Sequence, residues 1–306
     1  MTNLDREQTP HLPIGEMIRR EEEARRGGLQ VELHAISDVG RTRASNEDHF
    51  LALRVGRTLE ALDSNLPAEH LPPRLDQSGY VLMVADGIGG RLAGEHASRR
   101  ALSALVEVAT RIPDWILRLD EPRAAALMER AAAYFAEVDA LLEAESAADP
   151  ALAGMGTTMT VAYLLDQHLL IAHVGDSRAY RFRGGKLERL TRDQTMAQEL
   201  ADAGVIAESE VASHRQRHIL TGALGVSAGA PKVELGRHAL ADGDRVLLAS
   251  DGLSEMLPDE AIAPILARHG SSREACAALV EAALAAGGLD NVTVIVARCT
   301  FAAGRG

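Results

Sequence analysis

An α+β fold with largely antiparallel sheets is predicted by three features of this 306-residue sequence. Short β-branched apolar runs are separated by Gly, Asp and Asn residues, a pattern typical of strands joined by tight turns. Groups of such strands alternate with Ala- and Leu-rich helical stretches, without regular strand-helix-strand repetition. Hydrophobic residues make up 46% of the chain, which is ample for a buried core.

The apolar runs place the individual elements in chain order. Strands are expected at residues 31–37, 49–54, 80–85, 158–165, 168–174, 179–183, 245–250 and 292–298. Helices are expected at residues 94–111, 122–144, 259–269 and 273–286. Because several of the strands follow one another through tight turns, we expect them to pair antiparallel.

Two stretches fit neither pattern. Residues 55–79 contain Leu66-Pro67 and Leu71-Pro72-Pro73, which predict a long loop that no helix crosses uninterrupted. Residues 191–225 are polar and helix-forming, with Gly204 as the expected helix stop, and are interpreted as a flap-like excursion from the sheets.

The ends of the chain set the predicted domain boundaries. Residues 14–26 carry charges of both signs in a helix-compatible stretch that stops at Gly27-Gly28. We therefore expect a charged N-terminal extension over residues 1–28, interpreted as a solvated tail rather than a partner-docking helix. One domain is expected over residues 29–301, followed by a tail at 302–306.

Composition excludes several classes of partner. The 32 Lys and Arg residues against 44 Asp and Glu residues give a net charge of −12, which opposes binding to nucleic acid or anionic lipid. Cys276 and Cys299 are too few for a disulfide framework or a cysteine-built zinc site. No apolar run reaches the roughly 18 residues of a membrane span. The sequence thus predicts a cytoplasmic monomer with neither nucleic-acid nor membrane partners.

Acidic residues follow or precede the predicted strands with unusual regularity. Apolar strands run directly into Asp86-Gly87 and into Asp251-Gly252. Further carboxylates beside predicted strands are Glu47, Asp48, Asp176 and Asp290. A single Asp-Gly pair is usually only a turn. Several carboxylates brought together would repel one another unless they were protonated or bound to a cation.

The donor atoms also indicate which cation would bind. Carboxylate oxygens and a backbone carbonyl are hard ligands that favour magnesium or manganese over zinc or copper. Two such ions about 3.5–4 Å apart lower the pKa of a bridging water and hold an in-line phosphoryl displacement. The pattern therefore predicts hydrolysis of a phosphate ester.

Six short motifs give the chain a family resemblance. They are Arg43–Asp48 (RASNED), Asp86–Gly90 (DGIGG), Gly156–Thr158 (GTT), Gly175–Tyr180 (GDSRAY), Ser250–Gly252 (SDG) and Asp290–Val294 (DNVTV). In order and spacing they resemble the bacterial branch of the metal-dependent protein serine/threonine phosphatases, the type 2C or PPM class. The resemblance covers nearly all of residues 29–301. It implies a four-layer α-β-β-α sandwich with the metals in a cleft at one end.

The resemblance also implies the metal ligands. Asp86 would be shared by two Mn²⁺ or Mg²⁺ ions, and the carbonyl of Gly87 would bind one of them. Asp251 and Asp290 would complete the ligands of the other ion. Asp176, together with Asp251, matches the position that binds an additional, weaker ion in relatives.

Other positions are implied to act around these ions. Glu47 and Asp48 would hold metal-bound waters or lie just behind them. Arg43 matches the arginine that grips the phosphate, and its planar fork suits phosphate oxygens. The alternative for Arg43 is a surface salt bridge. Asn291 is expected to support Asp290 or the start of the last strand rather than to bind metal.

The implied activity is metal-dependent hydrolysis of phosphoserine and phosphothreonine in proteins, opposing a serine/threonine kinase. Three positions depart from the family pattern. Ile88 replaces a histidine that many eukaryotic relatives use to protonate the leaving alkoxide, and isoleucine donates no proton. Gln194 stands where a histidine is common, and Gly222 replaces a frequent arginine.

Competing interpretations are weaker. A dinucleotide fingerprint fails because Leu92 stands where its last glycine belongs. Cys299 and Arg305 have the spacing of a cysteine phosphatase, but the chain stops before any helix that would activate the thiol. His214 and His218 are better explained as a polar helix face than as a metal clasp. The remaining alternative is a catalytically inactive phosphatase fold that binds phosphoproteins or acts as a scaffold.

Overall fold

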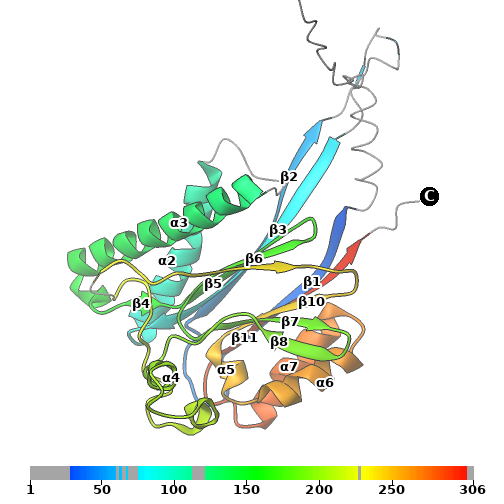
Figure 1. The fold of residues 1–306 in the computed structure, drawn as a ribbon. Coiled ribbons are helices and arrows are strands. Elements are labelled where there is room, and N and C mark those ends of the chain that lie inside the picture. Colours follow the sequence, from blue (N-terminus) through cyan, green and yellow to red (C-terminus); the bar gives the residue numbers. More distant parts are fainter. Residues whose placement is uncertain are drawn as a thin grey trace, which may run out of the picture.

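Two antiparallel sheets packed face to face form the centre of the molecule (Figure 1). The computed structural model describes residues 28–59, 62–63, 67, 75–111, 121–226 and 229–301. The helix expected within the N-terminal extension and the tail at 302–306 lie outside these residues. Within the described part of the chain, no helix has the length and apolar character needed to cross a membrane.

The first sheet has five strands in the order β1-β11-β10-β7-β8. Their bounds are β1 Leu29–Asp38, β7 Arg178–Arg183, β8 Lys186–Arg189, β10 Arg245–Ala249 and β11 Val292–Phe301. All neighbouring pairs are antiparallel. The pairing of Leu29 with Phe301 brings the two ends of the described domain side by side.

The second sheet runs in the order β2-β3-β5-β6-β9, and a short strand β4 pairs with the end of β3. Their bounds are β2 Asp48–Leu59, β3 Leu75–Ile88, β4 Gly156–Thr157, β5 Met159–Leu165, β6 His168–Val174 and β9 Glu234–Ala239. These pairs are antiparallel as well. The long β2-β3 pair extends beyond the other strands (Figure 1).

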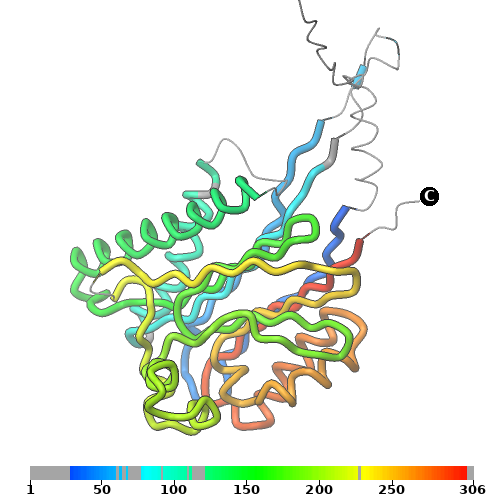
Figure 2. The backbone as a smooth tube through the Cα atoms, in the orientation of Figure 1, coloured from blue at the N-terminus to red at the C-terminus, as the bar shows by residue number. Residues whose placement is uncertain are grey.

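Helices cover the outer face of each sheet, as the backbone tube shows (Figure 2). The α-helices are α2 Arg91–Thr110, α3 Glu121–Ala148, α4 Met196–Asp202, α5 Asp251–Ser254, α6 Asp259–Arg268 and α7 Ser272–Ala285. Two 3₁₀ turns are η2 Pro150–Leu152 and η3 Glu208–Ser213. Helices α2 and α3 pack on the second sheet, whereas α6 and α7 pack on the first.

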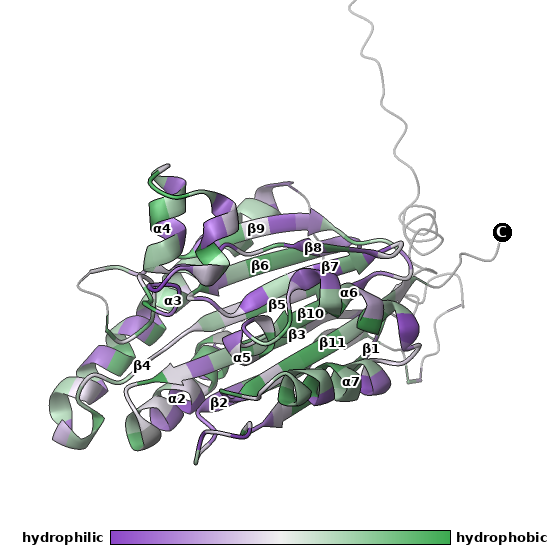
Figure 3. Ribbon diagram, turned by 90° about the horizontal axis from the view of Figure 1, so that it is seen from below, coloured by the Kyte–Doolittle hydropathy of each residue, from purple (hydrophilic) through white to green (hydrophobic). Residues whose placement is uncertain are grey.

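Three apolar clusters separate these layers. Along β3, Val81 and Met83 face α2 and α3, while Leu82 and Val84 alternate into the space between the sheets. Side chains of the first sheet alternate in the same way, with Leu247 facing α6 and α7 and its neighbours facing the other sheet. Figure 3 shows long hydrophobic stretches in central strands such as β11, and mixed hydrophobic and hydrophilic residues along the helices. This is the four-layer sandwich implied by the family resemblance.

The structure corrects the bounds of the expected loop at 55–79, while most of its middle, including Leu71-Pro72-Pro73, lies outside the described residues. Strand β2 continues to Leu59 and β3 begins at Leu75, with Leu59 paired to Leu75. These strand ends are held by the ladder hydrogen bonds of the pair rather than by a buried apolar face, since residues 56–59 are exposed. Strands β8 and β9 also went unpredicted, because both are short and carry charged residues.

Within residues 191–225, the structure places helix α4 and the turn η3. Helix α4 begins after Thr195, whose side chain accepts a hydrogen bond from the Gln198 amide. It ends at Asp202 with Ala203 as its C-cap, and the next residue, Gly204, has a left-handed φ of 71°, which suits the residue after a helix C-cap. The expected helix stop is confirmed.

Candidate active site

Asp86 lies near the end of β3, where the strand turns through Gly89 and Gly90 into α2. Both glycines have positive φ values, 115° and 83°, which suit this sharp change of direction. In the β2-β3 ladder Asp86 is paired with Asp48. Two carboxylates are therefore fixed on adjacent strands of the second sheet.

Asp251 and Asp290 come from the first sheet. Asp251 follows β10 as the first residue of α5, and Asp290 lies two residues before β11. Because β10 and β11 are antiparallel neighbours, the end of one and the beginning of the other lie at the same sheet end. Ser250 links the two sheets there, since its Oγ donates to Asp48 Oδ2 at 2.7 Å and accepts from the Thr293 amide at 3.0 Å.

Close backbone contacts bring these strand ends together. A Cβ on Gly252 would lie 1.9 Å from the carbonyl oxygen of Asn291, and one on Gly87 would lie 2.1 Å from that of Gly94. Asn291 accepts a hydrogen bond from the Glu47 amide at 2.8 Å through Oδ1. Its Nδ2 donates to the carbonyls of Val39 and Ser45. Asn291 thus supports the backbone beneath the carboxylates.

One cavity of about 430 Å³ gathers most of the predicted site residues. Those lining it are Arg43, Glu47, Asp86, Gly87, Asp176, Asp251 and Asp290. Asp48 is buried behind them, with 4% of its surface exposed, and bonds Ser250. Residues separated by up to 247 positions in the chain therefore converge.

Several carboxylates at this cavity are buried close to one another, and both effects raise their pKa values. Burial raises the pKa of Asp86 well above its usual range, and the charges of Asp48 and Asp251 raise it further. Burial likewise raises the pKa of Asp251 well above its usual value, with Asp176 adding to the effect. The pKa of Asp48 is raised to about 6 and that of Asp176 to about 7, in both cases chiefly by burial.

These residues fit hard divalent cations. Asp48 Oδ1 and Asp251 Oδ1 are buried, and neither accepts a hydrogen bond. Among the described residues, no three His, Cys, Asp or Glu side chains already form a closed cage for one ion. Magnesium-type ions do not require such a cage, because they keep several waters and take only one or two carboxylates each. A cation would neutralise the crowded carboxylates and satisfy the orphaned oxygens.

Arg43 is the basic residue at this cavity. Its side chain is 51% exposed, and Nη2 donates to Asp290 Oδ2 at 2.5 Å. A guanidinium carries five N–H donors, of which this bond uses one. The arrangement leaves donors for the oxygens of a phosphate held at the mouth of the cavity.

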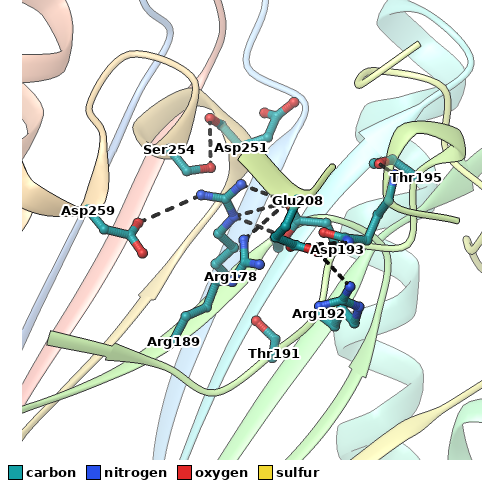
Figure 4. A network of polar contacts seen from close by, with 12 residues as sticks. Arg178, Arg189, Thr191, Arg192, Asp193, Thr195, Glu208, Asp251, Ser254 and Asp259 are labelled. Carbon is teal, nitrogen blue, oxygen red and sulfur yellow. Dashed lines mark hydrogen bonds and ion pairs between the residues drawn. The ribbon is translucent and has the colours of Figure 1, made fainter. Parts of the chain in front are cut away.

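The flap-like segment at 191–225 is tied to the body of the domain at its base. Arg178 of β7 donates to both carboxylate oxygens of Asp193, at 2.9 Å and 2.6 Å, and its Nη1 lies 3.9 Å from Asp259 Oδ1 (Figure 4). Burial opposes the charge on Arg178, but the paired Asp193 raises the pKa of the guanidinium above its usual range. The base of this segment is therefore fixed beside the acidic cavity.

The three departures from the family pattern lie close to the cavity. Ile88 lines it directly. Gln194 Oε1 accepts from the Gly175 amide at 3.1 Å, and Nε2 donates to the Lys232 carbonyl at 3.0 Å. A Cβ on Gly222 would lie 1.8 Å from Gln194 Oε1, so this glutamine occupies the space that a larger residue at 222 would need.

His214 and His218 do not lie on a common helix face. Residues 214–218 form a turn rather than a helix, which overturns the expected helical spacing. His214 Nδ1 accepts from the Gln216 amide at 3.3 Å. His218 instead lines the acidic cavity and forms an ion pair with Glu255. Sequence reasoning missed Glu255 and the pairing of His218 with it, since nothing local connects the two residues.

Comparison with known proteins places these features in a wider group. The family model described as "Protein phosphatase 2C" matches residues 73–286, a range that includes Asp86, Asp176 and Asp251 but not Arg43 or Asp290. The serine/threonine protein phosphatase PstP of Mycobacterium tuberculosis is 37% identical over 88% of this chain, which spans 45% of the length of PstP. The serine/threonine phosphatase stp of Listeria welshimeri is 33% identical over 85% of this chain and 92% of its own length.

Solved structures agree with the fold. The serine/threonine phosphatase of S. agalactiae superposes with a TM-score of 0.71 at 28% identity, covering 88% of this chain and 99% of the other. The catalytic domain of PstP, solved in complex with two manganese ions, gives a TM-score of 0.67 at 32% identity, with 89% and 99% coverage.

Proposed function

Since this chain belongs to the protein phosphatase 2C family, we propose that it hydrolyses phosphoserine and phosphothreonine in proteins, using divalent cations held in the acidic cavity. The observation that carries the proposal is the convergence of Asp86, Asp251 and Asp290 on one cavity that Arg43 also lines. The buried, unpartnered oxygen of Asp251 supports a bound cation there.

Two Mn²⁺ or Mg²⁺ ions are proposed, with Asp86 between them. Gly87 would contribute its carbonyl to one ion, and Asp251 and Asp290 would contribute carboxylates to the other. When bound, such ions lower the pKa of a coordinated water and orient it for in-line attack on phosphorus. Asp176 would help Asp251 to bind a third, weaker ion.

The remaining residues of the site have supporting roles in this proposal. Glu47 and Asp48 would hold waters around the ions, and Ser250 fixes the Asp48 carboxylate by its hydrogen bond of 2.7 Å. Arg43 would orient the phosphate through its guanidinium N–H groups. The low-dielectric surroundings of the buried carboxylates would strengthen each of these interactions.

Phosphorylated proteins are the proposed substrates, and a serine/threonine kinase is the proposed opposing enzyme. The phosphatase names of the curated relatives support the substrate class. The division into an N-terminal extension, a catalytic domain at 29–301 with a flap-like segment, and a short tail is part of the same proposal. The cytoplasmic location and the monomeric state remain predictions from the sequence.

The proposal is tested with purified protein and a phosphothreonine peptide. Hydrolysis should require Mn²⁺ or Mg²⁺, should stop in excess chelator, and should be lost in Asp251→Ala. Glu137→Gln is a matched control, because it removes an exposed carboxylate on α3, away from the cavity. Activity that persists in chelator would exclude the metal mechanism, whereas inactivity with every divalent ion would favour the phosphoprotein-binding scaffold.

A further inference from the structure

His218 and Glu255 form a pair on the wall of the acidic cavity. His218 follows η3 in the flap-like segment, and Glu255 follows α5, four residues after Asp251. The ion pair joins His218 Nδ1 to Glu255 Oε1. The His218 side chain is 46% exposed, and both residues line the same cavity as Arg43 and Asp86. An imidazole therefore faces the space where we place the phosphate.

Backbone hydrogen bonds anchor the segment that carries His218 beside the site. The Met196 amide donates to the carbonyl of Ile219 at 2.8 Å, and the Thr221 amide donates to that of Gln194 at 2.8 Å. The Gln194 amide in turn donates to the carbonyl of Gly175 at 2.7 Å, next to Asp176. His218 is thus connected through two short backbone links to the loop that carries a cavity carboxylate.

The reaction needs a proton donor that the sequence pattern does not supply. Breaking the bond between phosphorus and the serine or threonine oxygen leaves an alkoxide, a poor leaving group unless it is protonated. Ile88 has no proton to give, and an arginine such as Arg43 stays protonated in proteins. Carboxylates that bind cations are ionised. Of the described residues lining the cavity, His218 is the only histidine.

The pairing with Glu255 defines which ring nitrogen is available. An ionised carboxylate only accepts hydrogen bonds, so Nδ1 keeps its proton and donates a hydrogen bond to Glu255. The other ring nitrogen, Nε2, carries the second proton when the imidazole is charged. A carboxylate partner holds the ring in one orientation.

We propose that His218 is the general acid of this site and that Glu255 positions it; the proposal rests on the function proposed above. As water attacks phosphorus, the bond to the side-chain oxygen breaks and its electron pair stays on that oxygen. This oxygen takes the proton from His218 Nε2, so that serine or threonine leaves as the neutral alcohol. The attacking water releases one proton to solvent, and His218 recovers one from solvent.

Dependence on the leaving group tests the proposal. The single-turnover rate of His218→Asn should fall by about 10²-fold or more on a phosphothreonine peptide, the range of general acid catalysis. On p-nitrophenyl phosphate the rate should stay near that of the unaltered protein, because p-nitrophenolate leaves without a proton. Glu255→Gln should show the same selective loss to a smaller extent. His214→Asn, which alters a histidine that does not line the cavity, is the matched control.

The possible outcomes separate the two proposals. Selective loss on the phosphopeptide supports His218 as the acid. Equal loss on both substrates, or no loss on either, overturns that role while leaving the phosphatase function intact. Absence of hydrolysis of both substrates by the unaltered protein with Mn²⁺ contradicts the function itself. Calorimetric Mn²⁺ titration of His218→Asn should match the unaltered protein, and weakened binding would indicate a structural role instead.

Discussion

Arg43 Nη2 donates a hydrogen bond to Asp290 Oδ2 at 2.5 Å, so the guanidinium assigned to phosphate contacts a carboxylate assigned to a metal ion. A cation at Asp290 would compete with Arg43 for the same oxygen. Binding of the cation would therefore free guanidinium N–H groups for the phosphate. If these two roles hold, the pair would make phosphate binding depend on the metal without any change of fold.

Arg43→Ala should raise KM for a phosphothreonine peptide by about 10-fold or more, because a hydrogen bond to a charged group contributes about 1.5–3 kcal/mol. The value of kcat should change little if the interaction is equally strong in the ground state and the transition state. Mn²⁺ affinity should not fall, since the variant removes a competitor for Asp290. Steady-state kinetics with Arg43→Lys as the charge-conserving control measures this, and an unchanged KM would contradict the role.

Asp86→Asn should weaken Mn²⁺ binding by at least about 100-fold, because loss of a residue that merely supports a ligand already costs 10–100-fold. Isothermal titration calorimetry measures the affinity directly. Glu137→Gln removes the same charge from an exposed position on α3 and should bind Mn²⁺ normally. Equal affinities in Asp86→Asn and this control would remove Asp86 from the ligand set.

Metal binding should release protons in mildly acidic solution. The pKa values of Asp48 and Asp176 are raised to about 6 and about 7, so these carboxyls are partly protonated where ordinary ones are ionised. A cation favours the ionised form, so protons should leave on binding at about pH 6 and far fewer should leave at about pH 8.5. Titrations in buffers of different ionisation enthalpy count these protons. Equal release at both pH values would contradict the raised pKa values.

Both cysteines should be inert in the folded protein. Cys276 and Cys299 are fully buried free thiols, and burial raises the pKa of each to about 12. A thiol reagent should therefore modify neither until the chain is unfolded, and alkylating agents should leave phosphatase activity unchanged. A rapidly reacting thiol whose modification stops hydrolysis would instead support the cysteine-phosphatase interpretation.

Gly252→Ala should disturb the site through its backbone. The new Cβ would lie 1.9 Å from the Asn291 carbonyl oxygen, so the segments carrying Asp251 and Asp290 would have to separate. We expect a loss of about 1–3 kcal/mol in the free energy of unfolding, as for other overpacked positions, together with weaker Mn²⁺ binding. Gly270→Ala is the control, because no atom lies within 4 Å of its added Cβ. Similar free energies of unfolding for the two variants would show that the backbone at Gly252 tolerates a Cβ beside the Asn291 carbonyl.

The strands that could be predicted are those whose apolar pattern is local. The apolar runs of β3 and β10 lead into Asp86-Gly87 and Asp251-Gly252, and the sequence alone shows both features. β8 had a signal that went unused, since Gly184 and Gly185, both at positive φ, form the two-residue turn of a hairpin. No such local signal exists for β9, because its own residues do not favour a strand. It is held in the sheet by pairing with β6, whose residues lie 60 or more positions earlier in the chain.

The site was predictable where carboxylates end strands, but its connections were not. Ser250 bonds Asp48 across 202 positions, and His218 meets Glu255 only because two segments fold over one cavity. Gln194 and Gly222 are a further pair of this kind, since the Gln194 side chain fills the space beside Gly222 that a larger residue would need. Such pairs depend on tertiary packing, which no local pattern encodes.

Carboxylates from both sheets are proposed to hold a pair of divalent cations. Anomalous X-ray diffraction from crystals grown with Mn²⁺ tests this proposal most directly. Two anomalous peaks are expected beside Asp86, one of them also beside Asp251 and Asp290. Crystals that bind Mn²⁺ only elsewhere, or show no peak in this cavity at saturating Mn²⁺, would contradict it.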